Sequence, residues 1–450
     1  MSASIFKAYD IRGLVDVEIS PDFTFATGAA FARFLKAERE PGTVVIGEDM
    51  RPSSPAFADA FSAGITSQGL DVIRIGLAST DMLYFAAGKL NLPGAMFTAS
   101  HNPAAYNGIK MCLSGARPIG KESGLLTIEK FVNEGSPISL NQVGVERHEE
   151  MLDQYVAHLL NLVDQSGSRK LKIVIDAGNG MAGYTAPAVF KELNAEVIEM
   201  YYELDGTFPN HEANPIDPEN LKDLQKAVKK HKADIGLAFD GDADRCFLVD
   251  EKGELVNPSS LTSLIATREL AKYPGSTIIY NLISSKAVRE IVEESGGVSV
   301  RSRVGHSYIK KLMAETGAVF GGEHSGHFYF RDFWRADSGM LAALHAIAAL
   351  GESTVPLSEL LAPFNRYFSS GEINSTVKDA VAASSQIEEI YGAQEGVELD
   401  HLDGLTVSGQ TWWFNLRASN TEPLLRLNVE ATSAKEMAKI RDSVLNTIRA

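Results

Sequence analysis

Short apolar, β-branched segments alternate with longer amphipathic segments along most of the chain. This alternation predicts β-α-β units with largely parallel sheets. The predicted strands fall in three passes, at 43–47, 71–76 and 94–98, at 171–176, 195–201 and 234–239, and at 276–280, 298–301 and 318–321. Helices are predicted between them at 55–67 and 220–232 and from Ser284 and His306. The pattern therefore predicts three related α/β units.

The last 80 or so residues have a different pattern. Residues 412–419 alternate as an extended segment, 424–430 form a further apolar strand, and a helix closes the chain. Ser433 and Glu436 have the spacing of a capping box at the start of that helix. One face of the helix is apolar and is expected to pack on the sheet; its residues are Met437, Ile440, Val444 and Ile448.

A fourth, α+β domain is therefore predicted at the C-terminal end of the chain. The length of 450 residues agrees with several domains, since single domains usually have roughly 100 to 200 residues. The predicted domains cover residues 1–145, 146–253, 254–367 and 368–450.

Composition narrows the class of protein. A net charge of −16, from 42 Lys and Arg against 58 Asp and Glu, disfavours a nonspecific binder of nucleic acid or of an anionic membrane. Two cysteines do not form a disulfide framework, so a reducing compartment is expected. No secretory signal pattern and no apolar run of the roughly 18 residues needed to span a membrane is found. We therefore expect a cytoplasmic protein without a membrane helix.

A serine follows the strand at 94–98, within Thr98-Ala-Ser-His-Asn-Pro103. Because α/β sheets place their sites at the carboxyl ends of strands, Ser100 is a candidate nucleophile. A serine beside Asn and Pro is more commonly a turn former. The adjacent His101 does not by itself make a Ser-His-Asp triad.

Three aspartates at alternate positions follow the strand at 234–239, in Asp240-Gly-Asp-Ala-Asp-Arg245. If the chain curls at Gly241, their carboxylates can converge on one hard cation, and we favour Mg²⁺. An EF-hand is the main alternative, but Arg245 stands where that loop requires glycine, and strands rather than helices flank the segment. A solvated acidic turn is disfavoured because apolar strands lie on both sides.

A glycine-rich segment supports a competing class of enzyme. Gly178-Asn-Gly-Met-Ala-Gly183 has the G-x-G-x-x-G spacing of dinucleotide-binding turns, and Glu199 or Glu203 lies about 20 residues further on. An NAD-dependent oxidoreductase is therefore the strongest rival hypothesis. Glycines at a strand-to-helix turn are also common for close packing alone, and this hypothesis leaves the serine and aspartate motifs unexplained.

Two further polar loops offer groups for a phosphorylated sugar. Gly321-Gly-Glu-His-Ser-Gly-His327 combines a carboxylate, a hydroxyl and imidazoles, which suit vicinal sugar hydroxyls. Arg417-Ala-Ser-Asn-Thr-Glu-Pro423 supplies a guanidinium, hydroxyls and an amide, which suit a phosphate monoester. Either segment alone could be an ordinary loop, but four such loops, one in each predicted domain, point to a shared site.

These motifs resemble the α-D-phosphohexomutase superfamily, in the family's order and over essentially the whole chain. The resemblance also includes Phe6-Lys-Ala-Tyr-Asp-Ile-Arg-Gly13. It implies four domains around a central cleft, three related α/β domains with mixed sheets and a smaller C-terminal α+β, TBP-like domain that binds phosphate. It further implies a magnesium-dependent isomerase of phosphorylated hexoses, with a hexose 1,6-bisphosphate as intermediate and activator.

The resemblance assigns expected roles to individual residues. Ser100 would be the phosphoserine and would hold Mg²⁺ together with Asp240, Asp242 and Asp244. His101 and Lys110 are the alternatives for proton transfer, and Arg12 would lie beside the reacting serine. The expected substrate contacts are Tyr9, Arg245, His306, Glu323, Ser325, His327, Arg417, Ser419, Asn420 and Thr421.

The identity of the sugar is less constrained. The segments 329–333, 337–340 and 413–417 look most like phosphomannomutases, so mannose phosphate is the expected substrate, with glucose phosphate or both sugars as alternatives. Phosphoglucosamine mutases usually carry glutamine where His324 stands. A phosphosugar phosphatase and a noncatalytic sugar-phosphate sensor are the alternatives from other classes. The sequence leaves the oligomeric state open.

Overall fold

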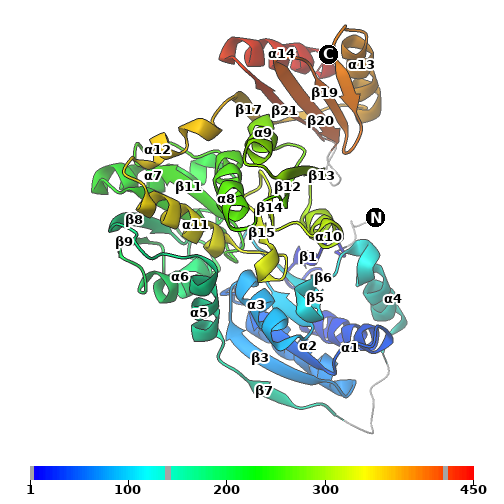
Figure 1. Ribbon diagram of the computed structural model, residues 1–450. Coiled ribbons are helices and arrows are strands. Elements are labelled where there is room, and N and C mark those ends of the chain that lie inside the picture. The colour runs from blue at the N-terminus through cyan, green and yellow to red at the C-terminus, as the bar shows by residue number, and fades with distance from the viewer. Residues whose placement is uncertain (1–4, 137–142, 419–423, 450) are drawn as a thin grey trace.

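The computed structural model describes residues 5–136, 143–418 and 424–449. These residues form four sheets, and the N-terminal and C-terminal sheets lie at opposite ends of the molecule with the other two between them (Figure 1). The first three sheets mix parallel and antiparallel strands, and the fourth is antiparallel. The predicted fold class, three mixed α/β sheets followed by an α+β unit, is confirmed.

The first sheet has the strand order β1-β5-β4-β2-β3-β7, with β6 paired to β5. Its strands are β1 (Ile11–Leu14), β2 (Thr43–Glu48), β3 (Asp71–Leu77), β4 (Gly94–Phe97), β5 (Tyr106–Leu113), β6 (Arg117–Pro118) and β7 (Glu146–His148). Its helices are α1 (Pro21–Ala37), α2 (Ser54–Ser67), α3 (Thr80–Leu90) and α4 (Leu126–Glu134), with short turns at Ser114–Ala116 and Lys121–Leu125. Strand β7 continues this sheet just beyond the predicted limit at residue 145.

The second sheet has the order β11-β10-β8-β9. Its elements are α5 (Leu152–Leu162), β8 (Leu171–Asp176), α6 (Ala182–Phe190), β9 (Ala195–Met200), a short turn at Pro218–Leu221, α7 (Lys222–His231), β10 (Ile235–Phe239) and β11 (Cys246–Asp250). Strands β8, β9 and β10 are parallel, whereas β11 returns antiparallel to β10. The tight return places the aspartate loop at the carboxyl end of β10.

The third sheet has the order β13-β12-β14-β15-β16. Its strands are β12 (Thr277–Asn281), β13 (Val298–Ser302), β14 (Phe320–Gly322), β15 (Phe328–Phe330) and β16 (Ala336–Asp337). Its helices are α8 (Pro258–Lys272), α9 (Lys286–Glu294), α10 (His306–Thr316), α11 (Gly339–Glu352) and α12 (Leu357–Leu360), with short turns at Arg331–Phe333 and Ala362–Phe364. The loop between β14 and β15 carries the predicted sugar-binding residues.

The fourth sheet has the order β17-β21-β20-β19-β18. Its elements are β17 (Phe368–Thr376), α13 (Ala380–Gly392), β18 (Glu398–Asp400), β19 (Leu405–Ser408), β20 (Trp412–Ala418), β21 (Leu424–Ala431) and α14 (Ala434–Ile448). Ser433 caps α14 by accepting a hydrogen bond from the Glu436 backbone N–H. Ile440, Val444 and Ile448 are buried in this unit's core and Met437 packs against it, as predicted.

The apolar cores show which units are fused. One large cluster runs through the first three sheets and includes Val45, Ile173 and Phe320. The fourth sheet has a separate core around Leu427 and Phe414. The first three units are thus packed into one block, and the C-terminal unit is attached to it through polar contacts described below.

Helix α11 is almost entirely buried in the large core. No single helix among the described residues is long and apolar enough to cross a membrane. Helix α11 and the segment Leu357–Phe364 pass such a test only as a pair, bent by 99° at the break between them.

A buried carboxylate joins the first three units. Asp81, at the start of α3, accepts hydrogen bonds from the Tyr155 hydroxyl at 2.7 Å and from the Ser338 hydroxyl at 2.6 Å. Tyr155 lies on α5, and Ser338 caps α11. Burial raises the pKa of Asp81 to about 6, although the hydroxyl donors oppose the shift.

This raised pKa predicts a pH-dependent stability. A carboxyl group whose folded pKa is raised contributes stability below its unfolded pKa of about 4 and loses it as the pH rises through 6. Between pH 4 and 7 the wild type should therefore lose about 3 kcal/mol of unfolding free energy relative to Asp81→Asn. Calorimetric unfolding of both proteins across this range measures the difference. Asp153→Asn, on the exposed side of α5, is the control, and a constant wild-type-to-Asp81→Asn difference would refute the prediction.

Candidate active site

The loop after β4 holds Ser100 in an unusual backbone conformation. Its φ is 50°, in the left-handed region that residues other than glycine seldom occupy. The residue is 1% exposed, its N–H donates to Thr98 Oγ1 at 2.9 Å, and its Oγ donates to Asp240 Oδ2 at 2.8 Å. The loop thus directs the serine hydroxyl at the aspartate motif from the second sheet.

The three aspartates converge as the sequence predicts. Asp240, Asp242 and Asp244 are buried, and each offers one oxygen within 4.8 Å of the oxygens of the other two. A Cβ at Gly241 would lie 2.4 Å from the Ser100 carbonyl oxygen, so only glycine allows the two loops to approach this closely.

The aspartate oxygens fit a divalent cation. Asp242 Oδ1 and Asp244 Oδ1 are buried and have no hydrogen-bond donor among the described residues. The other oxygen of each is occupied, since Lys110 Nζ donates to Asp242 Oδ2 at 2.7 Å and to Asp244 Oδ2 at 2.6 Å. Two unsatisfied buried carboxylate oxygens are costly unless a cation balances them, and hard oxygen ligands suit Mg²⁺.

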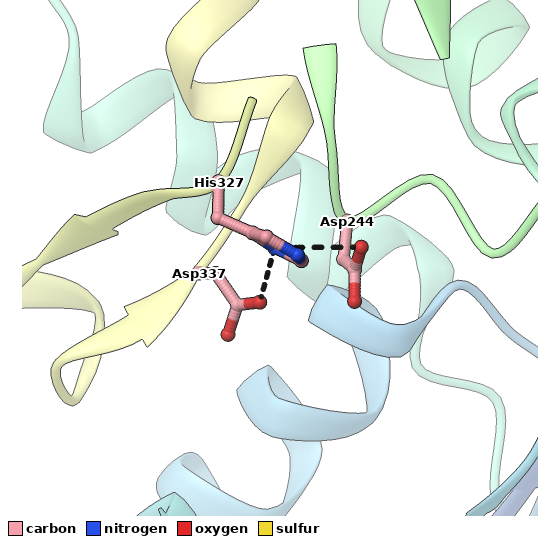
Figure 2. A group of neighbouring side chains, drawn as sticks. All are labelled: Asp244, His327 and Asp337. Atoms are coloured by element: carbon pink, nitrogen blue, oxygen red, sulfur yellow. Dashed lines mark ion pairs between the residues drawn. The ribbon is translucent and has the colours of Figure 1, made fainter. Parts of the chain in front are cut away.

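A second acidic group lies beside the first and is satisfied by cationic side chains. Figure 2 shows His327 between Asp244 and Asp337, with Nδ1 3.7 Å from Asp244 Oδ1 and 3.0 Å from Asp337 Oδ2. Lys310 Nζ lies 2.6 Å from Asp337 Oδ1. Burial alone would lower the pKa of His327, but the two carboxylates raise it overall. This group is therefore an ion-pair network that connects the sugar loop to the aspartate loop.

The charge states of the two proton-transfer candidates differ. Arg245 and burial hold the pKa of His101 well below its usual value, so its imidazole is neutral. Burial disfavours the charged form of Lys110, but Asp242 and Asp244 raise its pKa well above the usual value, so it is an ammonium. Burial, with Asp244 and Asp242 close by, raises the pKa of Asp240 to about 8. A cation bound here would have to displace a proton from Asp240 at neutral pH.

Arg12 and Arg245 approach the serine loop from two directions. Arg12, on β1, forms an ion pair with Asp10 and donates to the Asn102 side chain. Arg245 Nη2 lies 2.8 Å from His101 Nδ1, and His101 Nδ1 is 3.3 Å from Ser100 Oγ. The predicted groups around the reacting serine therefore lie together, on loops from different units.

The predicted sugar contacts lie on the third unit. Glu323 is buried and accepts from the Tyr329 hydroxyl at 2.7 Å and from the Gly305 N–H at 3.0 Å. The backbones of Arg245 and His327 form an antiparallel bridge that joins this loop to the aspartate loop. Ser325 lines a cleft of about 850 Å³ that runs between the second, third and fourth units.

The predicted phosphate contact Arg417 lines the same cleft. It stands near the end of β20, with Nη2 3.6 Å from Glu372 and Nη1 3.7 Å from Asp403. Ser100 and the three aspartates are not among the residues that line this cleft. Ser419, Asn420 and Thr421 lie outside the described residues, as does the side chain of His306, the first residue of α10.

Tyr9 connects the N-terminal unit to the third unit. Its ring packs edge-on against Tyr308 of α10, with the ring centroids 6.5 Å apart. Burial raises its pKa to about 12, so it keeps its proton. The hydroxyl is thus a hydrogen-bond donor at the edge of the third unit.

All four segments match known domain families. Residues 3–138, 153–253 and 257–367 match the phosphoglucomutase/phosphomannomutase alpha/beta/alpha domains I, II and III, and residues 372–447 match the C-terminal domain of the same family. The chain belongs to the phosphoglucomutase/phosphomannomutase family.

Relatives agree over the full length. The chain is 41% identical over 450 residues to a protein of Xanthomonas campestris pv. campestris named "Phosphohexose mutases", covering 100% of this chain and 99% of that protein. It is 40% identical over 449 residues to a phosphomannomutase of Salmonella typhimurium, covering 98% and 97%. The crystal structure of a phosphoglucomutase/phosphomannomutase family protein of Burkholderia thailandensis superimposes with a TM-score of 0.90 at 32% identity, covering 99% and 98%.

The glycine-rich segment of this family member supports the aspartate loop. Gly180 packs against Gly241, where a Cβ at position 180 would lie 2.7 Å from the Gly241 carbonyl oxygen. The Met181 N–H donates to that same oxygen at 2.9 Å. The G-x-G-x-x-G spacing is therefore explained by close packing at the start of α6, and the NAD hypothesis loses its main support.

Two residues that the sequence reasoning missed also shape the site. Thr80 Oγ1 donates to Asp242 Oδ2 at 2.6 Å. Arg51 is fully buried and donates to the backbone carbonyls of the serine loop; the acceptors are Ser100 at 2.9 Å, Asn102 at 2.7 Å, Pro103 at 3.0 Å and Tyr106 at 2.9 Å. Both follow carboxyl ends of strands, β3 and β2, the same signal that identified Ser100 and Asp240.

Arg51 should therefore control the serine loop. In Arg51→Lys one ammonium cannot replace a planar guanidinium at four carbonyls and at Asp49, so we expect kcat to fall by roughly 10- to 100-fold with little change in KM. Steady-state kinetics and thermal unfolding measure the two effects. Arg33→Lys, at a half-exposed ion pair with Glu134, is the matched control. A wild-type kcat in Arg51→Lys would show that the clamp does not matter.

Proposed function

We propose that the protein is a phosphomannomutase that interconverts mannose 1-phosphate and mannose 6-phosphate through a phosphoserine at Ser100. The observation that carries the proposal is the 2.8 Å contact between Ser100 Oγ and Asp240, inside a trio of buried aspartates that suits Mg²⁺. Full-length relatives named phosphomannomutase, 39–40% identical, support the choice of mannose. We also propose the domain limits 1–145, 146–253, 254–367 and 368–450.

Asp240, Asp242 and Asp244, with the phosphorylated Ser100, would hold Mg²⁺. The bound ion would neutralise charge on the transferring phosphoryl group. The phosphoryl group leaves Ser100 Oγ for a free sugar hydroxyl, which gives a hexose 1,6-bisphosphate, and the other phosphate then returns to Ser100. A trace of hexose 1,6-bisphosphate would act as activator by phosphorylating Ser100.

Proton transfer falls to the two candidates with opposite charge states. His101 is neutral and can accept the proton of the attacking sugar hydroxyl once Arg245 turns from its Nδ1 toward the sugar. Lys110 is protonated and can donate to the departing serine oxygen. Arg12 beside the serine loop would stabilise charge on the phosphoryl group.

The remaining predicted residues would bind the nonreacting part of the substrate. Arg417 would hold the nonreacting phosphate with Ser419, Asn420 and Thr421, since guanidinium and hydroxyl donors suit phosphate oxygens. Glu323 and Ser325 would bind vicinal sugar hydroxyls. The other proposed substrate contacts are Tyr9, Arg245, His306 and His327.

Kinetics with two sugars test the proposal. The wild type with Mg²⁺ and trace hexose 1,6-bisphosphate should isomerise mannose 1-phosphate, and its kcat/KM relative to glucose 1-phosphate gives the sugar preference. A ratio near one would make it a dual phosphomannomutase/phosphoglucomutase, and a preference for glucose would make it a phosphoglucomutase. Release of inorganic phosphate without isomerisation would replace the mutase with a phosphatase.

A further inference from the structure

One turn of the third unit contacts carboxylates from two sides of the cleft. The Val304 N–H donates to Asp403 Oδ2 at 3.2 Å, and the next N–H, of Gly305, donates to Glu323 Oε1 at 3.0 Å. Asp403 belongs to the fourth unit, between β18 and β19, whereas Glu323 belongs to the sugar loop of the third. Adjacent peptide groups of this turn, Arg303–Gly305, therefore hold both carboxylates.

Asp403 also contacts the predicted phosphate-binding arginine. Its Oδ2 lies 3.7 Å from Arg417 Nη1, and its Oδ1 lies 3.9 Å from Arg303 Nη2. The Asn415 side chain donates to the Asp403 carbonyl at 3.0 Å. Both Asp403 and Arg417 are largely shielded, with side-chain exposures of 16% and 13%, so the carboxylate-guanidinium attraction is screened less than at an open surface.

The backbone around the turn leaves little freedom. Gly305 has a φ of 128°, and a Cβ there would lie 2.1 Å from the Tyr9 hydroxyl oxygen. Next to Asp403, Gly404 has a φ of 73°, and a Cβ there would lie 2.5 Å from the Leu416 carbonyl oxygen. Both partners of the Val304 hydrogen bond are thus fixed by glycines that pack against neighbouring chain segments.

We propose that Asp403 is a positioning residue that fixes the distance between the phosphate-binding Arg417 and the sugar-binding Glu323 through the turn Arg303–Gly305. Consecutive Cα atoms are about 3.8 Å apart, so one peptide unit sets the spacing of the two carboxylates. A substrate that binds both anchors needs that spacing. The inference rests on the proposed function, which assigns the phosphate to Arg417 and the sugar to Glu323.

Binding measurements in a Ser100→Ala background test the coupling without turnover. Calorimetric titration with mannose 1-phosphate would compare Asp403→Ala, Glu323→Gln and the double variant. We expect each single change to weaken affinity by roughly 10-fold and the double change by well under 100-fold, because either change already releases the shared turn. Losses that simply multiply would overturn the coupling.

Two further variants separate positioning from loss of structure. Asp403→Asn keeps an acceptor for the Val304 N–H and should regain most of the affinity lost in Asp403→Ala; failure to do so would overturn the role of the turn. Asp400→Ala is the matched control, since it breaks the Arg301–Asp400 ion pair across the same two units without touching Arg417 or the turn. It should bind like the parent, and a loss equal to that of Asp403→Ala would reduce the effect to general interface damage.

Kinetics in the Ser100 enzyme complete the test. Asp403→Ala should raise KM by roughly 10-fold and leave kcat within about 3-fold, because Asp403 does not touch the reacting phosphoryl group. A loss confined to kcat would contradict the positioning role. If the wild type fails to isomerise either hexose phosphate while the binding cycle shows coupling, only the proposed function fails; if no hexose phosphate binds, both fail.

Discussion

Ser100→Ala should lower kcat by ~10⁴-fold or more, because the proposed phosphoryl carrier is lost. The hydroxyl is 1% exposed and already lies 2.8 Å from Asp240 Oδ2, so no neighbouring side chain can take its place without rebuilding the loop. Substrate affinity should change little, because the proposed substrate anchors lie on other loops. Isomerisation kinetics and binding of mannose 1-phosphate to the variant measure the two effects.

The matched control for this variant is Ser299→Ala. Ser299 lies on β13 and donates to Glu293 at 3.0 Å, far along the chain from the serine loop. Wild-type turnover is expected for it. Residual isomerisation by Ser100→Ala above about 1% of the wild-type rate would mean that another residue carries the phosphoryl group.

Removal of the metal should have the second-largest effect. A chelator is expected to reduce kcat by ~10³-fold or more and added Mg²⁺ to restore it, since two buried aspartate oxygens otherwise have no partner among the described residues. Asp242→Asn should prevent the rescue. Glu254→Gln, an exposed carboxylate near β11, is the control and should be rescued fully.

The affinity for Mg²⁺ should also depend on pH. Because burial and neighbouring carboxylates raise the pKa of metal-free Asp240 to about 8, a cation must displace its proton. Binding should therefore tighten as the pH rises from 6 to 8 and then level off, as measured by calorimetry with Mg²⁺ alone. An affinity that is flat between pH 6 and 8, or full activity after chelation, would contradict a magnesium site at these aspartates.

Local patterns along the chain predicted much of the fold. The predicted helix at 55–67 is observed as α2, Ser54–Ser67, and the strand at 171–176 as β8, Leu171–Asp176, because each has strong apolar periodicity and clear ends. Strand β5, Tyr106–Leu113, was not predicted, since it is antiparallel and carries Asn107 and Lys110. Its polar residues have structural partners that only the three-dimensional fold supplies.

The site could be predicted only where the chemistry is concentrated in one segment. The aspartate motif is such a segment, and the structure brings its three carboxylates together. Arg51, Thr80 and Asp403 contribute single groups from loops distant in sequence, and their partners appear only when the units pack together. Of these, Arg51 and Thr80 follow the ends of β2 and β3, so a search of every strand end would have found them.

The most direct test of the account is phosphorus-31 NMR of enzyme first phosphorylated with glucose 1,6-bisphosphate and then given mannose 1-phosphate in a single turnover. The account predicts a phosphoserine signal, assigned to Ser100 by peptide mass spectrometry, that disappears as mannose 1,6-bisphosphate and then mannose 6-phosphate form. Inorganic phosphate in place of the bisphosphate, or a phosphoryl group on a residue other than Ser100, would contradict it.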